Sequence, residues 1–411
     1  MDIHVQRKID RAVGVPLCWI FSFLGLFSDR VAKGHVPSKI LVILLSEMGS
    51  LVLARPMFDL IRVRYPSARL YALCFKKNRE VLDILGLVPA ENIITIRGDS
   101  LSGLLLDTIA AVTKMRREQI DTVIDCELFS RVSSLYSFLC GAKVRVGFHR
   151  HTQEGLYRGS FINRPVLYNP YHHISEQFVN LVEAIGTDQV PRVKRIVGGV
   201  PFELPRITIG EEEKRRLLNR LESDFPQILG KRLVLIYPGG GLLPIRAWPW
   251  ENFCSLSERF LAAGYAVGIV GMESDKALAG GIVSRCRNES CVDLTGYTSS
   301  VRELMALFHL ACLLITNDGG PGHFASMTPI PSIVFFGPET PVLYRPLDKK
   351  SIPLHASLSC SPCLSAYNHR NSPCDGDNRC LKLISPEEVL HHAHALLNPI
   401  HGEDKSPWPM R

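Results

Sequence analysis

Residues 312–325, with the sequence CLLITNDGGPGHFA, join an apolar run to a glycine-rich turn and the start of a helix. The apolar run, 312–316, predicts a buried strand. Asp318, two glycines, a proline and His323 follow that strand. Bare backbone amides at a helix start bind anions, so the turn suits a pyrophosphate group. On these residues alone, Asp318 could instead be an N-cap and His323 a core histidine.

The same alternation of strand and helix runs through both halves of the chain. Helices are predicted at residues 51–64, 250–263 and 300–310. Such alternation is typical of right-handed βαβ units, which build a parallel sheet. Strands are predicted at residues 40–45, 69–74, 93–96, 122–125 and 143–146, and again at 233–237, 266–270, 291–294, 312–316 and 332–336.

The alternation stops between residues 186 and 211, where prolines and glycines are frequent. We therefore predict a linker between two Rossmann-like α/β domains, which would leave a cleft at the carboxyl ends of their strands. The predicted divisions are an N-terminal segment, 1–35, a first domain, 36–190, the linker, 191–210, and a second domain, 211–398, with a cysteine-rich loop at 357–382.

Length and composition set the broad class of the protein. At 411 residues the chain has roughly two to three times the usual length of one domain. It is 46% hydrophobic and 21% charged, which excludes a disordered, collagenous or coiled-coil protein. The net charge of +7 suits a small anion or a membrane surface, and no nucleic acid is expected as a partner. Most of the 12 cysteines lie in apolar runs, which indicates a reducing compartment.

The N-terminal segment combines apolar, aromatic and basic residues. Residues 13–27 are uncharged and apolar but too few for a membrane-spanning helix, and Pro16 interrupts them. Their aromatic side chains, with basic residues on both sides, are typical of a helix in a bilayer interface. No small-residue cleavage site follows Phe27, as a secretory signal would need. The alternative is a helix that packs on its own protein.

Two further loops follow predicted strands and carry candidate site residues. Residues 46–50, SEMGS, lie between the first strand and a helix, and Gly49 allows close backbone approach there. Residues 238–241, PGGG, follow another strand, and the guanidinium of Arg246 beyond them can bind a phosphate with two hydrogen bonds. Each loop could also be an ordinary connection between a strand and a helix.

Four short motifs lie on these loops: GSLVLARP at 49–56, a segment at 238–249 that ends in Arg-Ala-Trp-Pro, DGGPGHFA at 318–325 and FGP at 336–338. With them the chain resembles glycosyltransferase family 9, the ADP-heptose:lipopolysaccharide heptosyltransferases, over nearly its whole length. The resemblance implies the GT-B fold, with two Rossmann-like domains facing across a cleft. It also implies an inverting transfer of heptose from ADP-heptose to a lipopolysaccharide-type glycolipid, by an enzyme peripherally bound at the inner face of the cytoplasmic membrane.

The resemblance also assigns a donor site, and it requires no metal or other cofactor. In the family, the aspartate–glycine–histidine loop holds the nucleotide and its phosphates, a basic residue near Trp-Pro contacts the diphosphate, and a glutamate binds the ribose. Arg246 would stabilise the departing nucleoside diphosphate, which makes it a catalytic candidate as well. The matching donor-binding residues are Gly240, Arg246, Glu273, Asp318, Gly319, Gly320 and His323.

The first loop departs from the family at Ser50. Family members have an aspartate here, and its carboxylate is the proposed base that deprotonates the acceptor hydroxyl. A serine cannot accept that proton unaided, so we predict that Glu47 of the same loop is the base, with Glu127 and His149 as alternatives. A different acceptor or a loss of catalysis would equally account for Ser50.

Three classes of function are compared on these features. The leading hypothesis is a glycosyltransferase that uses a nucleoside diphosphate sugar and a glycolipid acceptor. The alternative is a catalytically weak sugar-nucleotide-binding protein of the same fold, which the serine in the first loop would explain. A nicotinamide-dependent oxidoreductase needs Gly-x-Gly-x-x-Gly after a first strand, and neither first-strand loop has that spacing.

The loop 357–382 contains four cysteines outside the predicted donor site. Four thiols this close together could hold a structural zinc ion, although their spacing is looser than in a zinc ribbon. Reduced thiols or a redox-sensitive pair are the alternatives. The four are Cys360, Cys363, Cys374 and Cys380.

Overall fold

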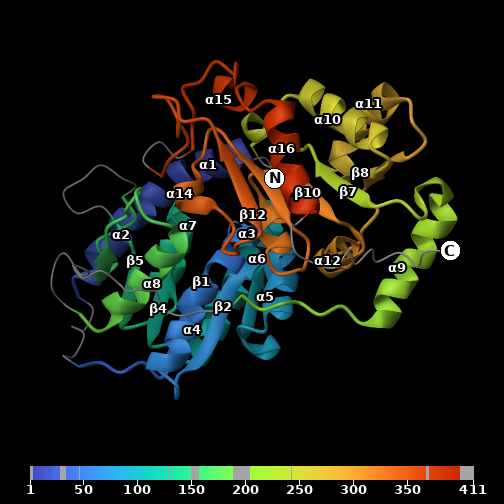
Figure 1. The fold of residues 1–411 in the computed structure, drawn as a ribbon. Coiled ribbons are helices and arrows are strands. Elements are labelled where there is room, and N and C mark those ends of the chain that lie inside the picture. The colour runs from blue at the N-terminus through green and yellow to red at the C-terminus, as the bar shows by residue number, and fades with distance from the viewer. Residues whose placement is uncertain are drawn as a thin grey trace. The chain divides into compact units, whose positions relative to one another are not determined.

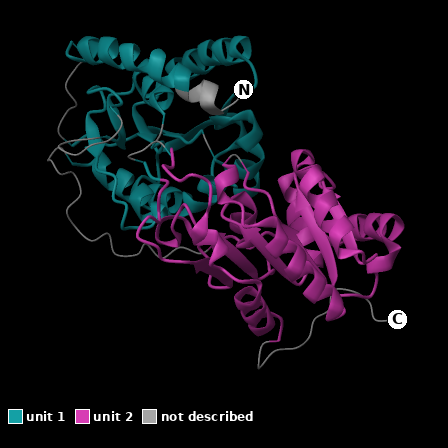
Figure 2. Cartoon of the chain, turned by 90° about the horizontal axis from the view of Figure 1, so that it is seen from above, with its two compact units in different colours: residues 1–203, 365–370 teal, residues 204–364, 371–411 magenta. Residues whose placement is uncertain are grey.

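The chain divides into two compact units, one of Met1–Glu203 with Ser365–Arg370 and the other of Leu204–Leu364 with Asn371–Arg411 (Figure 2). We refer to them as unit 1 and unit 2. Most of the predicted linker 191–210, up to residue 203, lies outside the described residues. The computed structural model describes residues 3–27, 34–45, 47–128, 130–149, 157–187, 204–241, 243–366 and 370–398.

Unit 1 is built on a six-stranded parallel sheet with the order β3-β2-β1-β4-β5-β6 (Figure 1). Nearly every residue of β1 and β4 is buried, as expected when helices cover both faces of a sheet. The strands are β1 (Lys39–Ile43), β2 (Arg69–Phe75), β3 (Ile93–Ile96), β4 (Thr122–Asp125), β5 (Val144–Phe148) and β6 (Arg164–Val166). The helices that follow β1 are α3 (Met48–Leu53), α4 (Arg55–Arg64), α5 (Arg79–Leu85), α6 (Leu101–Arg117), α7 (Arg131–Leu139) and α8 (Ile174–Ile185).

Unit 2 repeats this design, with a parallel sheet in the order β12-β11-β10-β7-β8-β9. Its strands are β7 (Leu233–Tyr237), β8 (Ala266–Gly271), β9 (Cys291–Thr295), β10 (Leu313–Asn317), β11 (Ser332–Phe336) and β12 (Ser351–His355). Its helices are α9 (Glu211–Asp224), α10 (Trp250–Ala262), α11 (Lys276–Cys286), α12 (Val301–Leu310), α13 (Gly320–Ala325), α14 (Pro341–Tyr344), α15 (Arg379–Lys382) and α16 (Pro386–Leu397).

Both sheets have the strand order 3-2-1-4-5-6 when the strands are numbered within each unit, which is that of a Rossmann fold. Ile43 at the end of β1 pairs with Asp125 of β4, and Thr316 of β10 pairs with Tyr237 at the end of β7. The loops after β1 and β4 therefore leave their sheet together, as do those after β7 and β10. Ligands of such sheets bind at this point, where the strand order reverses.

The predicted α/β class is confirmed, and the predicted strands lie within two residues of their observed bounds. The prediction of one helix at 51–64 is wrong, because two helices, α3 and α4, meet there at Ala54. Pro56 accounts for the break, since it lacks an N–H and its ring clashes with the carbonyl one turn back. The edge strands β6 and β12 were not expected from sequence, and they contain Pro165 and Pro353, which an edge tolerates.

Two helices precede the first strand, α1 (Ile3–Ala12) and α2 (Gly14–Gly25). One face of α2 packs on unit 1, where Cys18 is fully buried in a cluster with Leu135 and Phe161. The alternative of a helix packed on its own protein therefore holds for this face. No described helix has the length and apolar character needed to cross a membrane. The other face exposes Trp19, Ile20, Phe23 and Leu24, and Leu26 and Phe27 beyond the helix end are exposed as well.

Candidate active site

Asn317, the last residue of β10, fixes the two donor loops of unit 2 with its buried carboxamide. The Asn317 Oδ1 atom accepts a hydrogen bond of 2.9 Å from the backbone N–H of Trp248. Its Nδ2 group donates to the backbone oxygens of Pro238, at 2.9 Å, and Gly239, at 3.0 Å. The glycine loop after β7 and the Arg-Ala-Trp-Pro segment are thus both tied to the point where the strand order reverses.

Arg246 lies beside two carboxylates at this point. Its Nη2 group donates to Glu339 Oε1 at 2.9 Å, and its Nε atom lies 3.7 Å from Asp318 Oδ2. The three side chains are nearly inaccessible, with exposed fractions of 10% for Arg246, 2% for Glu339 and 8% for Asp318. Buried charges of opposite sign hold one another in a fixed orientation. The structure therefore brings together two predicted residues, Arg246 and Asp318, and adds Glu339.

The glycines of this edge permit close backbone approach. A Cβ atom on Gly240 would lie 2.8 Å from the Cα of Pro244 and 2.9 Å from the Leu243 oxygen, so only glycine fits there. Gly319 and Gly320 lead into α13, whose His323 is buried. The backbone N–H of Asp318 donates to the Phe335 oxygen of β11 at 2.9 Å.

Glu273 stands apart from this buried group. It follows β8, in a short 3-10 turn, and its carboxylate is exposed with Lys276 Nζ at 3.4 Å. A Cβ atom on Gly296 would lie only 2.5 Å from Glu273 Oε2, so the glycine leaves room for the carboxylate. Glu273 is thus at the same sheet edge as Arg246 but is open to solvent, as a contact to a ribose would need.

The first loop of unit 1 places Glu47 directly before α3, in extended backbone with φ −132° and ψ 131°. Its carboxylate does not cap the helix, and Oε1 instead accepts a hydrogen bond from Arg370 Nη1. Ser50 lies in the first turn of α3, where its backbone oxygen accepts from the N–H of Ala54 at 2.9 Å. Glu47 and Ser50, the predicted pair, are therefore both at the start of this short helix.

Two buried side chains hold the loop that carries Glu47. The backbone N–H of Leu45 donates to Glu127 Oε1 at 2.6 Å, and the Leu45 oxygen accepts from Asn78 Nδ2 at 2.6 Å. Glu127 is 4% exposed and Asn78 is fully buried. Glu127, an alternative base from the sequence, thus has a positioning contact. His149, the other alternative, lies just beyond β5 with its ring centroid 5.9 Å from that of Tyr157.

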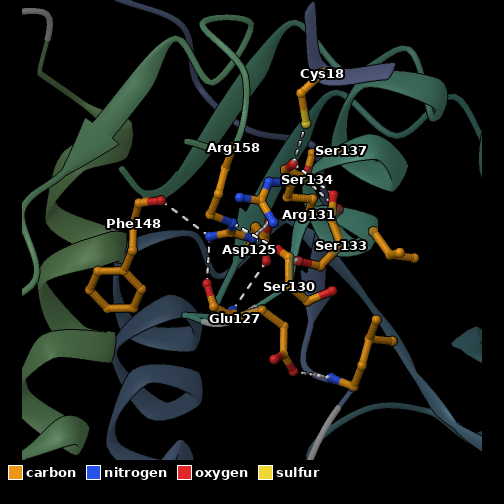
Figure 3. Close-up of polar contacts among 12 residues, drawn as sticks. Cys18, Asp125, Glu127, Ser130, Arg131, Ser133, Ser134, Ser137, Phe148 and Arg158 are labelled. Carbon is orange, nitrogen blue, oxygen red and sulfur yellow. Dashed lines mark hydrogen bonds and ion pairs between the residues drawn. The ribbon is translucent and has the colours of Figure 1, made fainter. Parts of the chain in front are cut away.

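A buried ion pair lies behind Glu127 (Figure 3). Arg158 Nη2 donates to Asp125 Oδ2 and, at 2.7 Å, to Ser133 Oγ. The guanidinium also donates to the backbone oxygens of Ser130, Glu127 and Phe148, at 2.9, 2.5 and 3.1 Å. Burial raises the pKa of the Asp125 carboxyl to about 6, and the charge of Arg158 opposes this shift. The pair joins the ends of β4 and β5 to the start of α7.

The cysteines are all free thiols. Cys360 and Cys374 are exposed, Cys363 is partly buried and Cys380 is buried. Within the described ranges, no three His, Cys, Asp or Glu side chains are grouped in a way that could hold a metal ion. The residues as placed do not fit the zinc site, which therefore stays a prediction.

Sequence reasoning did not single out Asn317, Glu339, Arg158 or Arg370 as site residues. Asn317 and Glu339 carry a weak signal, because each is a polar residue at or just after an apolar strand. Arg158 and Arg370 lie in polar stretches and pair with partners 33 and 323 positions away, so no local pattern marks them.

Solved structures of glycosyltransferases share this fold. Against the ADP-heptose lps heptosyltransferase II of E. coli, the TM-score is 0.66 at 20% identity, with 87% of this chain and 98% of that one covered. Against a family 9 glycosyl transferase from Veillonella parvula, it is 0.69 at 19% identity, with 89% and 99% covered. Two Rossmann-like units with these loops define the class of the protein, a glycosyltransferase of the GT-B fold.

The sequence comparisons place the chain within that class. It belongs to glycosyltransferase family 9 (heptosyltransferase), whose sequence model matches residues 109–372. It is 24% identical to lipooligosaccharide heptosyltransferase 2 of Haemophilus influenzae, over 76% of this chain and 87% of that protein. It is 25% identical to lipopolysaccharide heptosyltransferase 2 of Salmonella typhimurium, over 48% of this chain and 55% of that protein. The resemblance found in the four sequence motifs is confirmed.

Proposed function

We propose that this enzyme transfers heptose from ADP-heptose to a lipopolysaccharide-type glycolipid, with inversion at the sugar carbon. The observation that carries the proposal is Arg246, fixed by Asp318 and Glu339 where the strand order of unit 2 reverses. The named substrates of the family relatives supply the sugar and the acceptor class. Unit 2 would bind the donor, and unit 1 the acceptor.

In the proposed reaction, the acceptor oxygen attacks the sugar carbon opposite the diphosphate, and the bond from that carbon to the diphosphate oxygen breaks. Glu47 takes the acceptor proton. A guanidinium has five N–H donors, so Arg246 can hold both carboxylates and still donate to the diphosphate. Arg246 and the backbone amides at the start of α13 would stabilise the charge that develops on the departing group. No step requires a metal ion.

Arg246→Ala tests the donor assignment. We expect turnover to fall by about two to three orders of magnitude, as when one donor to a developing anion is lost. Labelled donor and a glycolipid acceptor would report transfer, and calorimetry would report nucleotide affinity. Arg259→Ala, at an exposed arginine on α10, is the matched control.

The melting temperature has to be followed in parallel, since Arg246→Ala leaves two buried carboxylates unpaired; Arg246→Lys keeps the charge. Unchanged affinity and rate in Arg246→Ala would contradict the assignment.

The exposed face of α2 supports a peripheral contact with the inner face of the cytoplasmic membrane. Trp19 and Phe23 are 64% and 62% exposed there, and Lys8 and Arg11 of the preceding helix are exposed beside them in the sequence. Aromatic and basic residues together are typical of interfacial helices. Replacing Trp19 and Phe23 by Ser should weaken binding to anionic vesicles at least about tenfold, whereas Val63→Ser, at an exposed site on α4, should not. Equal flotation of both proteins would contradict the contact.

A catalytically weak sugar-nucleotide-binding protein is the second candidate. Ser50, where the family has an aspartate, is the observation that favours it. Wild-type protein that binds ADP-heptose but transfers no sugar to any glycolipid would support this candidate. Measurable transfer would exclude it.

A further inference from the structure

Arg370 reaches Glu47 from a distant part of the sequence. The segment Ser365–Arg370 belongs to unit 1, although the residues before and after it belong to unit 2. The backbone N–H of Arg370 donates to the Ser365 oxygen at 3.0 Å, which closes the segment into a compact turn. Only 11% of the Arg370 side chain is exposed, and its Nη1 group donates to Glu47 Oε1.

The chain on both sides of this turn is anchored in unit 2. The backbone N–H groups of Cys363 and Leu364 each donate to the Pro338 oxygen at 2.9 Å. Asn378 Nδ2 donates to the Ile245 oxygen at 2.8 Å. Pro338 and Ile245 directly precede Glu339 and Arg246. The cysteine-rich loop is therefore fixed next to the donor residues along the chain, and Arg370 projects from it as a defined side chain.

Glu47 needs an external partner if it is to act in place of the family's aspartate. A glutamate has one more rotatable bond than an aspartate, and Glu47 is not held as a helix cap. Its side chain is 32% exposed even with Arg370 bound, so the carboxylate stays accessible to an acceptor hydroxyl. A charged hydrogen bond to one oxygen fixes the side chain.

We propose that Arg370 is a positioning residue for the acceptor base, which it holds ionised and aimed from the cysteine-rich loop. The proposal rests on the proposed function, because Glu47 has to be the base. It adds a task for a loop outside the four family motifs. A guanidinium contact favours the charged, proton-accepting form of a carboxylate. The opposite role, a contact that blocks Glu47 until substrate binds, predicts the opposite change in rate.

The test compares Arg370→Gln, Arg370→Lys and a control, Arg379→Gln, at an exposed arginine of the same loop. For Arg370→Gln we expect kcat to fall about tenfold, while the donor KM and the melting temperature stay near wild type. Arg370→Lys, which keeps the charge, should recover part of the rate, and Arg379→Gln should match wild type. An unchanged or raised kcat in Arg370→Gln would overturn the proposal.

A double-mutant cycle separates positioning from a general effect. If Arg370 acts through Glu47, the losses of Glu47→Asp and Arg370→Gln should combine to less than their product. Fully multiplicative losses would overturn the proposal while leaving the proposed function intact. Wild-type protein that transfers no sugar would refute the proposed function itself, and with it the role of Arg370.

Discussion

Arg158→Met would remove the centre of the buried network in unit 1 while keeping an unbranched side chain of similar length. Arg158 and Asp125 are 1% and 0% exposed, so water cannot replace the lost contacts without opening the core. The change strands the Asp125 carboxylate and removes the donors to three backbone oxygens, those of Ser130, Glu127 and Phe148.

The expected cost follows from these contacts. Breaking a buried ion pair from one side costs about 3–5 kcal/mol, because the remaining charge has no partner. Each buried carbonyl left without a donor adds about 1 kcal/mol or more. A total of about 6 kcal/mol is comparable with the whole stability of a typical domain, about 5–15 kcal/mol. Arg158→Met should therefore be marginally folded at neutral pH.

The cost should also depend on pH, with a definite sign. Burial raises the pKa of Asp125 to about 6, above its unfolded value of 3.8, and Arg158 restrains this rise. Without Arg158 the pKa rises further. The folded variant then binds the proton at a higher pH than folded wild type does. The stability difference between wild type and variant should therefore be smallest below about pH 6 and should grow as the pH rises above it.

Urea unfolding of both proteins at pH 5.5 and pH 8 would measure this difference. The control is Arg145→Met, at another buried arginine, which donates to the backbone oxygens of Phe161 and Ala142. Its stability loss should change little between the two pH values. Adding Asp125→Leu to Arg158→Met should recover part of the loss, because it removes the stranded charge. A loss below about 2 kcal/mol at pH 8, or one that shrinks as the pH rises, would refute the reasoning.

Two further outcomes are expected. Glu47→Gln should abolish transfer but preserve donor binding, and Ser50→Asp should keep or raise the rate, both measured with labelled donor; full activity of Glu47→Gln would move the base elsewhere. Asp10→Ala should lower the free energy of unfolding by about 1–2 kcal/mol, as the loss of a helix cap does. The Asp10 carboxylate accepts from the N–H groups of Arg131 and Val132 at the start of α7, at 2.7 and 3.1 Å; a melting temperature equal to that of wild type would contradict this role.

The sequence predicts the elements around each loop well, because strands buried on both faces have continuous apolar runs. It also predicts Arg246 and Asp318 together, since both follow such strands. It cannot show that Glu339 meets Arg246. That contact depends on the sheet order, in which β10 lies between β7 and β11, strands separated by 94 residues of intervening chain from Pro238 to Pro331.

Contacts between distant segments are the part that the sequence withholds. Glu47 and Arg370 are 323 positions apart, and neither belongs to a periodic pattern that would pair them. The N-terminal segment shows the same limit. Its composition fits both a bilayer interface and a packed helix, and only the fold shows that Cys18 is buried while Trp19 is exposed.

The two units solve one structural problem in the same way. Where the strand order reverses, the loop after the first strand needs a fixed shape, because its backbone approaches a ligand there. In unit 2, Asn317 at the end of β10 binds the backbone of Pro238 and Gly239 after β7. In unit 1, Glu127 just after β4 binds the backbone of Leu45 after β1. Each polar side chain comes from the fourth strand of its unit and holds the first loop. Since Glu127 Oε1 is engaged in this way, the exposed Glu47 carboxylate is the better placed of the two to accept a proton from an acceptor hydroxyl.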